Sequence, residues 1–75
     1  MPVFAPDKIK DARLDAGISR RDLARAVGRS VVAVKTYESG TRDVPASVLG
    51  LLARVLDVDV DAFYIPDEVR HAAAG

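Results

Sequence analysis

Two short stretches of helical pattern follow each other between Ser19 and Gly40, with only a few residues between them. Ser19 and Ser30 are of the residue types that cap helix N-termini, and Gly28 and Gly40 suit the left-handed residue that ends a helix. Apolar side chains recur at helical spacing between these signals, namely Leu23, Ala24, Val27, Val34 and Tyr37. We therefore expect two helices, the second ending near Ser39, joined by a tight turn.

The second stretch, residues 31–37, is rich in β-branched side chains and would alone predict a strand. Because a cap precedes it and a glycine stop follows it, we expect a helix instead. Two helices with a tight joint form a helix-turn-helix, a motif that typically places its second helix in the major groove of DNA.

Three further helices are predicted from apolar periodicity and capping signals, which gives an all-α fold with five helices. The first starts at Pro6 and Asp7, the fourth follows Val44 and Pro45, and a short fifth runs from Asp59 through Tyr64. We expect a loose N-terminal arm at 1–5, one domain at 6–65, and a C-terminal tail at 66–75 that is disordered or supports a dimer.

The composition limits the chain to one small domain and reveals an uneven charge distribution. It has 75 residues, no cysteine and a net charge of zero, so helix packing rather than disulfides must stabilise it. Residues 1–42 hold nine Lys or Arg against five Asp or Glu, a balance of +4, whereas residues 43–75 hold two against six, a balance of −4. This asymmetry predicts that one face of the protein binds phosphate and that another face has a different role. The alternative is that the charges cluster by chance in a short chain.

Nothing in the residue pattern suggests catalysis. The only histidine is His71 near the end of the chain, and there is no glycine-rich phosphate loop and no Ser/His/Asp set. We therefore expect no enzyme activity, no cofactor and no metal. The first residues lack a signal-peptide pattern and no apolar stretch has transmembrane length, so we expect a cytoplasmic protein without membrane contact.

The stretch from Ile9 to Tyr64 resembles the Cro/repressor-type (lambda-repressor-like, XRE) helix-turn-helix domain. The matching positions, without a gap, are Ile9, Arg13, Gly17-Ile18-Ser19, Leu23-Ala24, Val27-Gly28, Ser30, Val34, Tyr37-Glu38, Gly40, Leu49, Leu52-Ala53, Leu56 and Val58. The resemblance implies a lambda-repressor-like DNA-binding fold with the helix-turn-helix at helices 2 and 3. It also implies a structural pair, Arg13 with Glu38, that joins helix 1 to the end of helix 3. The competing interpretation is that Arg13 contacts DNA.

The expected base-contacting residues lie on the outward arc of helix 3. At about 100° per residue, Ala33, Val34 and Tyr37 point inward. The resemblance implies base contacts from Val31, Val32 and Thr36. Lys35 lies beside them, and we expect it to donate to guanine O6 or N7. Valine can contact only the thymine methyl group, so we expect thymine opposite the valines. The alternatives are that Val31 and Val32 pack against the N-terminal arm at Val3 or Phe4, or that they form a protein-binding patch.

Phosphate contacts are expected from cations and capped helix ends around the same motif. The predicted set is Ser19, Arg20, Arg21, Arg29, Ser30, Ser39 and Arg42. Arg20 stands where the family commonly has a glutamine, and we expect it to clamp a phosphate. Arg21 can instead balance Asp22 or face solvent, and we expect Arg25 to face solvent.

Helix 4 carries a second apolar stripe beside its core face. The predicted dimer interface is Val48, Leu51, Val55, Val58, Phe63 and Tyr64. The alternative is that the C-terminal tail folds back over this stripe.

Together these features predict a sequence-specific transcriptional regulator, a repressor or a Cro-like or controller-like protein. It would bind double-stranded DNA at a pseudo-palindromic operator as a homodimer, with helix 3 in the major groove. The alternatives are a protein-interaction module, such as an antitoxin-like partner, that keeps the helix-turn-helix fold, and a scaffold that keeps the fold without binding DNA.

Overall fold

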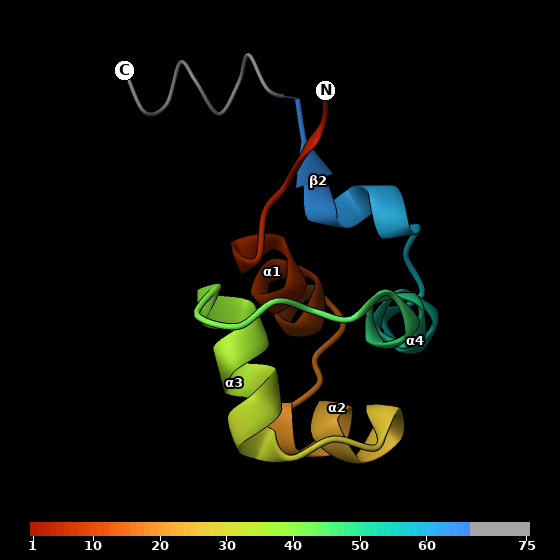
Figure 1. Cartoon of the computed structure of the whole chain (residues 1–75). Coiled ribbons are helices and arrows are strands. Elements are labelled where there is room, and N and C mark those ends of the chain that lie inside the picture. The colour runs from red at the N-terminus through yellow and green to blue at the C-terminus, as the bar shows by residue number, and fades with distance from the viewer. Residues whose placement is uncertain (67–75) are drawn as a thin grey trace.

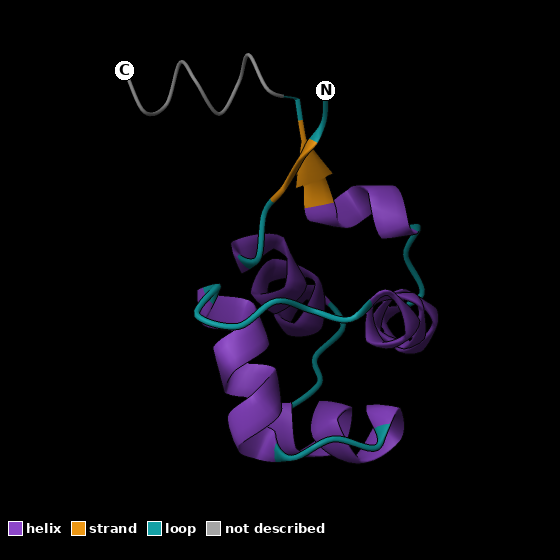
Figure 2. Ribbon diagram, in the orientation of Figure 1, coloured by secondary structure: helices purple, strands orange, loops and turns teal. Residues whose placement is uncertain are grey.

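The computed structural model describes residues 1–66 of the chain, which form four α-helices, one 3-10 turn and two short strands. In chain order these are β1 (Val3–Phe4), α1 (Asp7–Asp15), α2 (Arg20–Val27), α3 (Val31–Ser39), α4 (Ala46–Leu56), the 3-10 turn η1 (Val60–Phe63) and β2 (Tyr64–Ile65). Figures 1 and 2 place α2 and α3 at one end of the molecule and the strands at the other. Within residues 1–66, none of the helices combines the length and apolar character needed to cross a membrane.

The caps and stops of the helix-turn-helix form as the sequence predicts. The Ser19 hydroxyl accepts the Asp22 N–H at 3.0 Å, and the Ser30 hydroxyl accepts the Ala33 N–H at 3.0 Å. Gly28 is left-handed, with φ 69°, which allows the chain to leave α2 and enter α3 after two further residues. These local signals outweigh the strand preference of residues 31–37, and the prediction of a helix there is confirmed.

One core joins all four helices and η1. Its largest fully buried side chains are Ile9, Leu23, Val34, Val48, Leu52 and Phe63. Helix α2 packs against α3 and α4, and α1 packs against α3. Because α3 turns its Val34 and Tyr37 side into this core, its rotation about its own axis is fixed, and so is the set of side chains that it turns outward.

The fifth helix, predicted from Asp59 through Tyr64, forms only as the 3-10 turn η1 at Val60–Phe63, and Tyr64 lies in β2. After the four-residue turn η1 the chain becomes extended, and Tyr64 and Ile65 pair antiparallel with Phe4 and Val3. Aromatic and β-branched side chains of this kind favour strands. The rings of Phe4 and Tyr64 meet edge to face, with centroids 5.5 Å apart.

The N-terminal arm at 1–5, which the sequence predicts to be loose, contains the strand β1. The Val3–Phe4 strand holds the arm against β2, and the Ala5 N–H donates to the Phe63 carbonyl at 2.8 Å. Ala5 itself is buried. Apart from Pro66, the predicted tail at 66–75 lies outside the described residues.

Candidate nucleic-acid interface

The outward edge of α3 is open to solvent. Val31 is 42% exposed and Val32 70%, and Lys35 is exposed on the next turn, whereas Ala33 on the inward side is buried. The predicted orientation of the helix is therefore correct. The alternative in which the two valines pack against the N-terminal arm is wrong, because residues 3 and 4 pair with β2 instead.

Thr36 is half-buried beside this edge, and its hydroxyl is already used as a donor. Its Oγ1 donates to the Ala33 carbonyl at 2.7 Å. A threonine hydroxyl also has lone pairs that accept hydrogen bonds. With its proton committed inside the helix, Thr36 can offer a base an acceptor or its methyl group.

Exposed cations and hydroxyls surround the edge. Arg21, Arg25, Arg29 and Lys35 are exposed, and within residues 1–66 none of them has a carboxylate within 4.0 Å. Arg42 is also exposed, and the Ser39 hydroxyl lies 3.0 Å from that of Thr41 at the end of α3. Arg21 therefore faces solvent, as one alternative for it predicts, and forms no ion pair with Asp22.

The buried carboxylate of Glu38, near the C-terminal end of α3, forms ion pairs with α1 and α2. Glu38 Oε2 accepts from Arg13 Nε at 2.7 Å, and Glu38 Oε1 accepts from Arg20 Nε at 2.9 Å. Arg13 also donates to the Ile18 carbonyl at 2.9 Å and is buried, so it has no surface left for DNA. Sequence reasoning missed the second arginine, because no local pattern links positions 20 and 38.

The surface predicted for a dimer is only partly accessible. Val48 and Phe63 are fully buried in the monomer, so the prediction that they form an interface is wrong. Leu51 remains exposed, and Val55, Val58 and Tyr64 are half-buried and pack against the core. A helical wheel of α4 does not distinguish the buried Val48 from the exposed Leu51, because burial depends on which other elements pack on each side of the helix.

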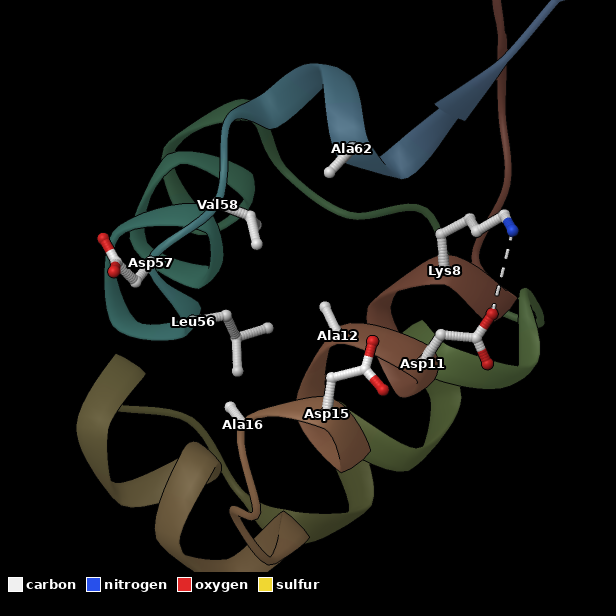
Figure 3. A pocket seen from close by; sticks show the side chains of 9 residues that line it. All are labelled: Lys8, Asp11, Ala12, Asp15, Ala16, Leu56, Asp57, Val58 and Ala62. Carbon is white, nitrogen blue, oxygen red and sulfur yellow. Dashed lines mark ion pairs between the residues drawn. The ribbon is translucent and has the colours of Figure 1, made fainter.

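A groove of about 590 Å³ between α1 and the end of α4 carries charge of the opposite sign (Figure 3). Its floor is apolar, with Ala12 and Leu56. Its rim carries Asp15, Asp57 and Asp11, the last paired with Lys8 at 3.8 Å, so the rim is negative overall. None of its lining residues belongs to α2 or α3. These carboxylates would repel phosphate, so this groove is unsuited to a DNA backbone.

Comparison with known proteins agrees with this geometry. The model of a helix-turn-helix domain family matches residues 7–63, which is more than half of the chain. No curated protein matches the sequence. Among solved structures, the restriction-modification controller protein C.AhdI from Aeromonas hydrophila is 26% identical with a TM-score of 0.73, over 77% of this chain and 88% of that chain.

A structure of the SinR protein/SinI protein complex is 22% identical with a TM-score of 0.70, over 92% of this chain and 74% of that chain, and shows the fold alone. The family match, the capped α2 and α3, and the outward edge of α3 agree with one another. The chain therefore belongs to the helix-turn-helix domain family, as a DNA-binding domain of the Cro/repressor type.

Proposed function

We propose that this protein is a sequence-specific transcriptional regulator that inserts α3 into the major groove of an operator. The observation that carries the proposal is the exposed edge of α3, where Val31 and Val32 face solvent on an otherwise well-packed domain. Exposed β-branched residues lower helix propensity and gain nothing from burial, so contact with a partner explains them best. Acting on DNA would place the regulator in the cytoplasm.

The chemistry of this edge suits a thymine-containing site. The valine methyl groups can contact only thymine methyls, whereas Lys35 can donate to guanine O6 and N7. Exposed arginines beside the edge can contact phosphates. Because the net charge is zero, non-specific attraction to DNA is weak, and base contacts and shape must supply more of the affinity.

Substitution of Val32 by alanine tests the base contact. The change removes the two methyl groups of an exposed side chain, and we expect it to lower the preference for thymine at one position by about 1 kcal/mol. In vitro selection on random duplexes identifies the site, and competition binding then measures the preference. Leu14→Ala is the control, because Leu14 is an exposed apolar residue on α1, and it should leave the preference unchanged.

An unaltered thymine preference in Val32→Ala would refute the methyl contact. If the wild-type protein enriches no sequence at all, the regulator proposal fails. The protein-interaction module with a helix-turn-helix fold would then be the better explanation.

We further propose that the regulator binds a pseudo-palindromic operator as a homodimer. The remaining exposed part of the apolar stripe on α4, Leu51 with the half-buried Val55, is the surface that supports this. Two-fold pairing would set two copies of α3 in successive major grooves about 34 Å apart. The similarity to a restriction-modification controller protein supports a regulator of this size.

Leu51→Glu is expected to give a folded monomer, because the charge would have to be buried without a partner in the dimer. Sedimentation equilibrium should give half the mass of the wild-type protein. Val60→Glu is the matched control, since Val60 on η1 is 37% exposed and Leu51 39%, and it should keep the dimer mass. A dimeric Leu51→Glu protein would exclude α4 from the interface.

A further inference from the structure

The carboxylate of Glu38 is shared between two arginines that differ in their surroundings. Its side chain is only 3% exposed, and each oxygen accepts from a different guanidinium. Arg13 is 8% exposed and has a second acceptor in the Ile18 carbonyl. The Arg20 side chain is 37% exposed, and within residues 1–66 its only hydrogen-bond partner is Glu38.

Arg13, Arg20 and Glu38 together carry one net positive charge, and the exposed part of this charge is the Arg20 guanidinium. Arg13 is enclosed, so the surface of the cluster consists of the Arg20 guanidinium, held by its Nε edge. An arginine bound through Nε keeps its Nη donors for another acceptor. Arg20 is also the first residue of α2, where the helix dipole favours an anion.

We propose that Glu38 is a positioning residue for DNA binding: it holds Arg20 so that the Nη atoms receive a backbone phosphate. This inference rests on the proposed DNA-binding function. A free arginine must lose its side-chain freedom when it meets a phosphate, whereas Arg20 has lost much of it already. Because Glu38 lies in the last turn of α3, the same contact fixes that phosphate relative to the recognition helix.

The direction in which Glu38→Gln changes DNA affinity distinguishes a positioning role of Glu38 from a purely electrostatic effect. Glu38→Gln removes a negative charge and makes the protein more positive, so charge alone would tighten DNA binding. If Glu38 positions Arg20, the same substitution weakens binding to the selected site by about threefold to tenfold, the usual cost of ordering one long side chain.

A double-mutant cycle with Arg20→Ala shows whether Glu38 acts through Arg20. Fluorescence anisotropy would measure the affinity of the wild type, both single variants and the double variant for the selected duplex, at a temperature where circular dichroism shows all four folded. We expect Glu38→Gln to weaken binding when Arg20 is present and to have no weakening effect when Arg20 is alanine. In an Arg25→Ala background, which removes an exposed arginine from the same helix, the full effect of Glu38→Gln should persist.

An equal loss in the presence and absence of Arg20 would overturn the proposal, since Glu38 would then act through the fold alone. Tighter binding by Glu38→Gln would overturn it as well. If Glu38→Gln does not fold, Arg20→Lys is the second test, because lysine keeps the charge but cannot bind Glu38 and a phosphate with opposite edges. Arg20→Lys should bind more weakly, and unchanged affinity would overturn the proposal. Absence of DNA binding by the wild type would instead refute the proposed function.

Discussion

Arg13→Ala is expected to lower the free energy of unfolding by about 3 kcal/mol, near the lower end of the range for breaking a buried ion pair. The substitution removes the shorter of the two hydrogen bonds to Glu38 and leaves that carboxylate with Arg20 alone. It also deprives the Ile18 carbonyl of a donor. A domain of 75 residues has a free energy of unfolding of only about 4 to 11 kcal/mol, so this loss should clearly lower the urea midpoint.

Urea denaturation followed by circular dichroism measures this loss. Lys8→Ala is the matched control, because Lys8 is also a cation on α1 but pairs with Asp11 at 3.8 Å on the surface. Exposed pairs contribute about 0 to 1 kcal/mol, so this control should unfold at nearly the wild-type midpoint. Equal midpoints for both variants would mean that the buried pair contributes no more than a surface one.

Phe63→Ala is expected to lower the free energy of unfolding by about 3 to 5 kcal/mol. Phe63 is fully buried and ends η1, the element that packs against both α1 and α4. Its carbonyl also accepts the Ala5 N–H, so a cavity here would weaken the attachment of β1. The change should appear as a lower urea midpoint at every protein concentration.

Leu51→Ala provides the comparison, since Leu51 is an exposed apolar residue and its truncation should cost the monomer less than about 1 kcal/mol. The same urea titration at low protein concentration measures the monomer. If Phe63→Ala changed the dimer mass while leaving the stability of the monomer intact, Phe63 would belong to an interface after all.

The parts of the fold that local chemistry determines could be predicted from the sequence. Ser19 and Ser30 cap their helices with hydrogen bonds to residues three positions away, and Gly28 and Gly40 adopt the left-handed conformation. These short-range interactions define α2 and α3, and helical spacing then fixes the outward edge. The orientation of that edge was therefore predictable, whereas its contacts with bases remain a prediction.

The parts that depend on distant residues could not be predicted. The Val3–Ile65 pairing and the Arg20–Glu38 ion pair join positions far apart in the sequence, and neither leaves a periodic signal. Val48 and Phe63 are buried because other elements cover them. The helical wheel of one segment gives no information about those elements. The apolar pattern of α4 and the residues after it therefore predicts a larger exposed apolar surface than the structure has.

The pairing of β1 with β2 has a practical consequence for labelling. It brings the backbone at Val3 and Ile65 to the same pole, opposite α2 and α3 (Figure 1). A fluorophore or a tethered module attached just before Val3 or just after Ile65 would leave the domain from that shared exit. Neither attachment would obstruct the outward edge of α3, and the two positions are interchangeable for labels that must leave that edge free.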